Sequence, residues 1–181
     1  NKTTKGILTK ESKGKWDTMI SYTKPQYHAS VTVSDAQNGW NSYSYYATSK
    51  AAAKAVTADS TAYALRAYWR PENSGTGTPA ISVGYDILDV EGNGNDVSEA
   101  DSYFVGLGWN DMFTPDDTIG IGFGQPLKAT KSGDGSTDVD PLIWEAYYSY
   151  KVNDSVTVQP AIFGGTDART DTKDDYFGVA L

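Results

Sequence analysis

The sequence is most informative at first for what it lacks. Its 181 residues include no cysteine and a single histidine, His28. The absence of cysteine excludes a disulfide framework and a thiolate metal site. One histidine cannot supply a histidine-based metal or catalytic cluster, and no nucleophile with a partner base is visible. We therefore expect no metal, no cofactor and no catalytic residues, and the chain is not expected to be an enzyme.

Positive charge and long apolar runs are also scarce. Fifteen Lys and Arg residues against 23 Asp and Glu give a net charge of −8, which argues against nucleic acid because phosphates require a basic surface. No apolar run of the length that a transmembrane helix needs is present. Asn1 to Lys10 are polar and contain no signal-peptide core. The length suits one domain, residues 1–181. We interpret this domain as a C-terminal fragment of a larger protein.

What the sequence has in abundance is alternation of apolar and polar residues. Within Thr61–Arg70, for example, Tyr63, Leu65 and Trp69 lie on one face and Arg66 lies on the other. About nine windows of roughly seven to ten residues follow this pattern, a length typical of tilted membrane-spanning strands. The windows are residues 16–23, 27–34, 61–70, 80–87, 102–110, 119–126, 141–151, 155–163 and 175–181.

The window IGIGFGQP, residues 119–126, shows the most extreme alternation. Large apolar residues occupy every second position and glycine occupies the positions between them. We expect the apolar side to face lipid and the glycine side to leave space in a lumen, where a loop or another backbone packs closely. The three apolar residues are Ile119, Ile121 and Phe123, and the glycines are Gly120, Gly122 and Gly124.

The links between the windows alternate between short and long, as they do in outer-membrane barrels with short turns at one end and long loops at the other. The longest, residues 35–61, either folds into the lumen as a constriction or contains a further strand, and its alanine-rich part, residues 48–56, suits a short helix. Residues 89–101 superficially match a calcium loop, but Ala100 stands where a bidentate carboxylate is required, so an acidic solvated loop is favoured.

Aromatic residues repeat along the apolar faces. On four windows an aromatic pair is separated by six residues, which predicts two girdles at the two membrane interfaces. On the four windows with these pairs, none of the apolar-face positions is charged. The predicted lipid-facing girdle residues are Trp16, Tyr22, Tyr63, Trp69, Tyr103, Trp109, Trp144 and Tyr150.

Charged residues fall on the opposite face of the same windows. Arg66, Tyr68 and Arg70 predict a basic ladder in the lumen that attracts anions or binds sugar hydroxyls, or else simply solvates the wall. The complete set of predicted pore-lining residues is Arg66, Tyr68, Arg70, Asp86, Glu145 and Lys151.

Several segments resemble a known family. Residues 66–87 (RAYWRPENSGTGTPAISVGYDI), 102–113 (SYFVGLGWNDMF), 120–126 (GIGFGQP) and 144–165 (WEAYYSYKVNDSVTVQPAIFGG) are similar to the C-terminal barrel of cyanobacterial outer-membrane porins. These belong with the carbohydrate-selective and iron-uptake porins that carry S-layer-homology domains. The resemblance implies a homo-trimer of barrels with about sixteen strands, passing small solutes or inorganic ions, and peptidoglycan binding through an N-terminal domain that this chain lacks.

The sequence thus predicts an all-β, antiparallel up-and-down transmembrane β-barrel, of which about nine strands are visible. The predicted function is passive diffusion of small hydrophilic solutes across the outer membrane of a Gram-negative-type, cyanobacterial cell, with the lipid bilayer as the surrounding partner. The alternative is a soluble all-β carbohydrate-binding module. The two differ in whether Trp69, Leu107 and Ile121 face outward or cluster in a dry interior.

Overall fold

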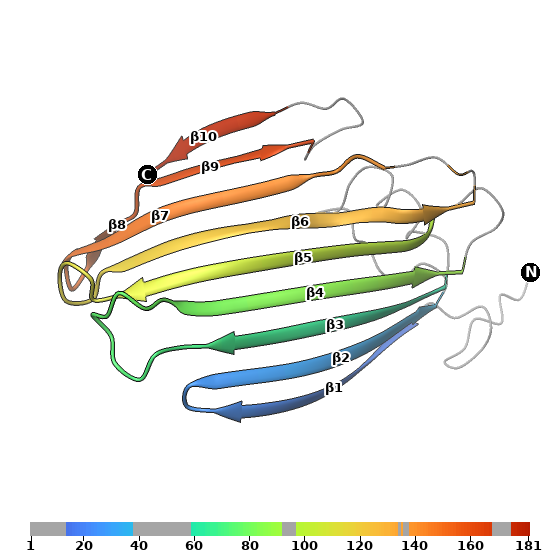
Figure 1. The fold of residues 1–181 in the computed structure, drawn as a ribbon, viewed down its shortest axis with the longest axis horizontal. Helices are drawn as coiled ribbons and strands as arrows, with labels where there is room; N and C mark the ends of the chain where they lie inside the picture. The colour runs from blue at the N-terminus through green and yellow to red at the C-terminus, as the bar shows by residue number, and fades with distance from the viewer. Residues whose placement is uncertain (1–13, 38–58, 92–96, 134, 136–137, 168–174) are drawn as a thin grey trace, which may run out of the picture.

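The computed structural model describes residues 14–37, 59–91, 97–133, 135, 138–167 and 175–181. They form one antiparallel meander of ten strands with no other layer (Figure 1). Among the described residues no helix is long and apolar enough to cross a membrane. The strands are β1 (Gly14–Lys24), β2 (Tyr27–Gln37), β3 (Ser60–Trp69), β4 (Ala80–Val90), β5 (Val97–Asn110), β6 (Thr118–Ser132), β7 (Leu142–Asn153), β8 (Val156–Val158), β9 (Ala161–Thr166) and β10 (Tyr176–Ala180).

The predicted antiparallel up-and-down arrangement is confirmed, since sequential strands pair from β1 to β7 and then through β9 to β10. The sheet is open: within the described residues, β1 and β10 each pair on one side only. We call the end with the β1–β2, β3–β4, β5–β6 and β7–β8 links the turn end, and the opposite end the loop end (Figure 1).

One predicted strand is two strands in the structure. The window 155–163 contains β8, which pairs with the end of β7, and the start of β9, which pairs with its beginning. Pro160 lies between them and has no N–H to donate to a ladder, although its carbonyl accepts a bond of 3.1 Å from the Tyr148 N–H. The described residues therefore form ten strands, where the sequence predicted about nine.

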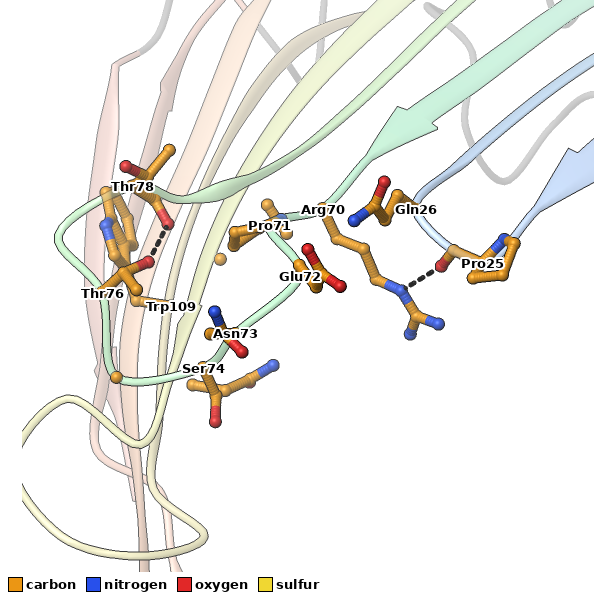
Figure 2. A pocket seen from close by; sticks show the side chains of 14 residues that line it. Pro25, Gln26, Arg70, Pro71, Glu72, Asn73, Ser74, Thr76, Thr78 and Trp109 are labelled. Carbon is orange, nitrogen blue, oxygen red and sulfur yellow. Dashed lines mark hydrogen bonds between the residues drawn. The ribbon is translucent and has the colours of Figure 1, made fainter.

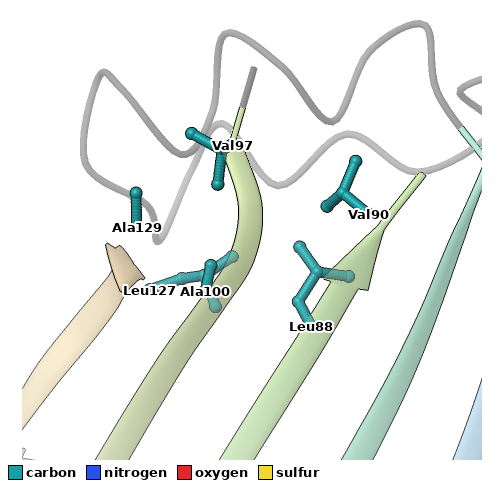
Figure 3. Packing of buried hydrophobic residues seen from close by; sticks show 6 residues of the cluster. All are labelled: Leu88, Val90, Val97, Ala100, Leu127 and Ala129. Atoms are coloured by element: carbon teal, nitrogen blue, oxygen red, sulfur yellow. The ribbon is translucent and has the colours of Figure 1, made fainter. Parts of the chain in front are cut away.

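The strands at the loop end are longer than predicted. β5 has 14 residues and β6 has 15, so residues 97–101 of the predicted acidic loop 89–101 belong to β5, while residues 89–90 belong to β4, with Asp89 opposite Glu99. The physical reason is that apolar side chains lie there on the face of the sheet opposite to that of Ile87, with Leu88 of β4 opposite Ala100 of β5 and Ala100 opposite Ala129 of β6. Apolar side chains of β4, β5 and β6 form a buried cluster at this end (Figure 3), which consists of Leu88, Val90, Val97, Ala100, Leu127 and Ala129. The predicted helix at 48–56 and nearly all of the segment 35–61 lie outside the described residues.

The register separates the residues into two continuous faces. On the apolar face, Ile121 of β6 lies opposite Leu107 of β5 and Ala146 of β7. On the polar face, Gly122 lies opposite Gly106 and Glu145. Because the side-chain period of a strand is two, the unbroken register across the middle of the sheet, from β1 to β7, keeps the two faces distinct there. Register shifts occur in the β5–β6 pairing at residues 97–103, near the loop end.

The glycines of the polar face accommodate aromatic rings from neighbouring strands. A Cβ built on Gly84 would lie 2.1 Å from the Phe104 ring, and one on Gly120 would lie 2.2 Å from the Tyr147 ring. The space predicted beside Gly120 is therefore filled by a side chain of the sheet itself. At Gly122, by contrast, the nearest atom to a built Cβ is 3.9 Å away.

This packing predicts opposite outcomes for two neighbouring glycines. Gly120→Ala should destabilise the protein by about 1–3 kcal/mol, the usual cost of overpacking, because the Tyr147 ring has to move. Gly122→Ala, the matched control on the same strand and face, should be neutral or slightly stabilising. Urea unfolding in detergent micelles measures both, and adding Tyr147→Ala should rescue Gly120→Ala. Equal destabilisation by both alanine substitutions would contradict the packing.

Candidate functional site

The apolar face is exposed across the sheet. Trp69 of β3 and Ile121 of β6 are each 41% exposed, and Leu107 of β5 is partly exposed. These residues do not cluster in a dry interior, and no second layer of the described chain covers them. An uncovered apolar face of this extent is not expected of a water-soluble sandwich, in which that face lines the core.

The eight predicted girdle residues of this face form two straight rows that run obliquely across the strands. Trp16 lies opposite Asp35, and Asp35 lies opposite Thr61, two residues before Tyr63. The same two-residue offset recurs at each following odd-numbered strand as far as β7. The loop-side row is Trp16, Tyr63, Tyr103 and Trp144, and the turn-side row is Tyr22, Trp69, Trp109 and Tyr150.

The offset gives the angle between the rows and the strands. Two residues advance about 7 Å along a strand while two strands span about 10 Å across the sheet, so each row makes an angle of roughly 35° with the direction perpendicular to the strands. Transmembrane strands tilt by about 35–45° from the membrane normal. Rows with this offset therefore lie parallel to the membrane plane when the strands have the usual tilt.

Charged residues on the apolar face lie beyond the rows. On the loop-end side Asp101 accepts hydrogen bonds from the Tyr85 hydroxyl at 2.9 Å and from Gln125 Nε2 at 3.0 Å. Asp35, Asp89 and Glu99 are also beyond the loop-side row, and Lys24 is beyond the turn-side row. In the described strands the band between the rows contains no charged side chain on this face.

The polar face carries a compact charged cluster on β3, β4 and β5. The Arg66 guanidinium forms an ion pair with the Asp86 carboxylate at 2.7 Å, and Ser102 Oγ donates to the same carboxylate at 3.0 Å. The guanidinium also lies over the Phe104 ring, 5.4 Å from its centroid. Sequence reasoning placed Arg66 and Asp86 on this face but missed Ser102 and Phe104. Phe104 had a signal, because it is the one large aromatic out of phase with the apolar alternation of its window.

The remaining predicted pore-lining residues are dispersed. Tyr68 is on the polar face and stacks on His28 with 5.5 Å between ring centroids. Glu145 is exposed on the same face of β7, and none of the described residues forms an ion pair with it. Lys151, near the turn end, pairs with Asp116 at 3.0 Å and also with Asp154.

Arg70 lies past the end of β3, at the edge of a turn-end pocket of about 470 Å³ (Figure 2). Its Nε donates to the Pro25 carbonyl at 2.7 Å, which ties the β3–β4 link to the β1–β2 turn. Trp109 also lines this pocket and donates from its indole to the Gly77 carbonyl at 3.0 Å. Arg66, Tyr68 and Arg70 therefore have three separate environments rather than one continuous basic surface.

The β5–β6 link is organised around a buried carboxylate. Asp117 is 1% exposed and accepts hydrogen bonds from the N–H groups of Met112, Phe113 and Thr114 at 2.7–3.0 Å and from the Tyr148 hydroxyl at 3.1 Å. Burial alone would raise the pKa of Asp117, but these hydrogen bonds to the charged form outweigh it and hold the pKa below its usual value.

Comparison with known proteins identifies a family. The family described as carbohydrate-selective porin, OprB family, matches residues 9–163, which is most of the chain. No curated protein and no solved structure matches the sequence.

The carboxylate of the β5–β6 link predicts a pH dependence. Because the pKa of Asp117 is lowered in the folded protein, its stabilising effect is complete above the unfolded value of about 3.9 and is lost only as pH falls through the lower folded value. Amide hydrogen exchange at Met112 to Thr114, corrected for intrinsic rates, should show constant protection from pH 8 to about 4 and a loss below that. Asp117→Asn should weaken this protection and remove its acid transition. A loss of protection already between pH 7 and 5 would contradict the assignment.

Proposed function

The chain belongs to the carbohydrate-selective porin family, and we propose that it forms part of the wall of an outer-membrane channel through which small sugars diffuse passively. The family is one of outer-membrane channel proteins of Gram-negative bacteria. The single observation that carries the proposal for this chain is the apolar face, with two parallel aromatic rows and charges only beyond them. Such a face suits a bilayer, which is apolar at mid-depth and polar at both boundaries.

The distance between the rows supports this orientation. Six residues of strand span about 20 Å, which corresponds to roughly 17 Å along the membrane normal at a tilt of 35°. The outward apolar band of a transmembrane barrel is about 25 Å tall, so the rings are expected near its inner edges. The turn end then faces the periplasm, because short links are periplasmic in such barrels.

The polar face supplies the channel wall in this proposal. Arg66 and Asp86 neutralise each other, but their remaining lone pairs and N–H groups can exchange hydrogen bonds with hydroxyl groups. Phe104, which is 40% exposed, offers an apolar surface beside them, and a pyranose ring presents both hydroxyl and C–H groups. A paired cluster of this kind favours neutral sugars over ions, with Glu145 adding a weak preference for cations over anions.

Closure of the channel requires more strands than those described. Backbone N–H and C=O groups along the free edges of β1 and β10 would each cost several kcal/mol in hydrocarbon if unsatisfied. We propose that further strands pair with both edges, in a barrel of about sixteen strands as the resemblance implies. Homo-trimer assembly, a cyanobacterial source, passage of inorganic ions and peptidoglycan attachment through another domain rest on the resemblance alone.

The bilayer orientation predicts a depth-dependent cost of charge. Ile121→Arg, between the rows, should destabilise the protein in lipid by about 2–4 kcal/mol, whereas Gln125→Arg, on the same face of β6 beside the loop-side row, should cost about 0–1 kcal/mol. Urea unfolding in phospholipid vesicles measures the difference. Equal costs at the two positions, or a monodisperse protein in the absence of detergent, would instead favour a soluble carbohydrate-binding module.

The charged cluster predicts changes in ion selectivity of opposite sign. In planar bilayers, Arg66→Glu should shift the reversal potential in the direction of greater cation selectivity, because the substitution adds a second carboxylate beside Asp86. Asp86→Asn should shift the reversal potential in the direction of greater anion selectivity, because the Arg66 charge is then no longer neutralised by Asp86. Lys24→Glu, on the apolar face beyond the turn-side row, is the control and should leave the potential unchanged. Unaltered potentials in both cluster variants would exclude this cluster from the conducting wall.

A further inference from the structure

Phe113 is an exposed apolar side chain on a link that has little freedom to move. It is 73% exposed, whereas phenylalanine is usually buried. Its backbone N–H is held by the buried Asp117 carboxylate together with those of Met112 and Thr114. A further bond of 2.8 Å from the Asp116 N–H to Asp111 Oδ1 braces the other side of the link. The ring is therefore presented to the surroundings by a fixed backbone.

The contacts of Phe113 show which side of the sheet it occupies. Its ring packs edge-on against the Tyr148 ring, with 6.0 Å between centroids and an interplanar angle of 71°. Tyr148 lies on the apolar face opposite Ile119 and stacks on Tyr150 of the turn-side row at 6.4 Å. Phe113 thus continues the apolar face at its turn end, rather than pointing toward the polar face.

The same link removes a charge from that boundary. Asp117 immediately precedes β6 and bonds to the hydroxyl of Tyr148 on the apolar face. A carboxylate exposed at the edge of the hydrocarbon would be costly, but here three N–H groups and a hydroxyl satisfy it and leave it 1% exposed. Beside it, Asp116 pairs with Lys151 at 3.0 Å. The link therefore combines an apolar tip with carboxylates that are buried (Asp117), ion-paired (Asp116) or hydrogen-bonded to the backbone (Asp111).

We propose that the β5–β6 link is a membrane anchor, with the Phe113 ring inserted at the boundary between headgroups and acyl chains of the periplasmic leaflet. The inference rests on the proposed function, since it takes the apolar face to be the lipid-facing one. A lipid surface is favoured over a protein partner because Phe113 is continuous with the turn-side aromatic row. A phenyl ring on a rigid scaffold loses little conformational entropy when it inserts.

Depth measurement by spin labelling tests the anchor directly, because the chain contains no cysteine of its own. Nitroxides are attached to Phe113→Cys, to Ile121→Cys at mid-depth on the apolar face, and to Thr78→Cys on the exposed β3–β4 link. The protein is reconstituted in vesicles of phosphatidylethanolamine and phosphatidylglycerol. The ratio of collision with oxygen to collision with a water-soluble nickel chelate should be highest at 121, intermediate at 113 and lowest at 78.

Other orders of the collision ratios at these three positions would contradict either the anchor or the proposed function. A ratio at 113 equal to that at 78 would place the tip in water and overturn the anchor. Low collision with both reagents at 113 would indicate a protein contact, such as a second copy of the chain, and would also overturn it. A water-like ratio at 121 would overturn the proposed function itself. Substitution of the ring itself gives an independent check. Phe113→Asp should lower the folded yield in these vesicles, whereas Phe113→Leu, which keeps an apolar side chain, should give the yield of the unmodified protein.

Discussion

The structure depends on one constraint, which is that the strands share a register that brings their uncharged, apolar faces between the two aromatic rows to the same side of the sheet. A shift of one residue in any pairing would carry that strand's apolar residues to the polar face. The pairing of Leu107, Ile121 and Ala146 across β5, β6 and β7 shows the constraint being met. No described layer covers this face, so in the proposed function a surrounding bilayer takes the place of a protein core.

The polar face is organised by a second pattern, in which large side chains and glycines alternate between neighbouring strands. Phe104 lies over Gly84 and Tyr147 lies over Gly120. Large rings can lie flat on the sheet only where the adjacent strand has no Cβ. Rings that lie along the sheet project little from it. The Phe104 ring in this position lies under the Arg66 guanidinium, which also forms the ion pair with Asp86. The glycines and the charged cluster are thus parts of one arrangement.

The two ends of the sheet are built differently. At the loop end the strands extend past the loop-side row and pack a buried cluster that includes Leu88, Ala100 and Leu127 (Figure 3). At the turn end, polar contacts such as Arg70 to Pro25 and the bonds around Asp117 fix the links. Apolar packing thus stabilises one end and hydrogen bonding the other, and the ordered links of the turn end suit a surface at the edge of a bilayer.

Period-two alternation by itself determined the strands, their faces and the aromatic pairs, because these depend on neighbours in the chain. It also placed Arg66, Asp86 and Glu145 on the polar face. It did not determine which strand positions lie opposite each other, so the ion pair of Arg66 with Asp86, the straightness of the aromatic rows and the ring over Gly120 emerged only from the tertiary structure. Pro160 and the bonds to Asp117 show the same limit: a break or a buried charge is tolerated only where distant residues satisfy the backbone and the carboxylate.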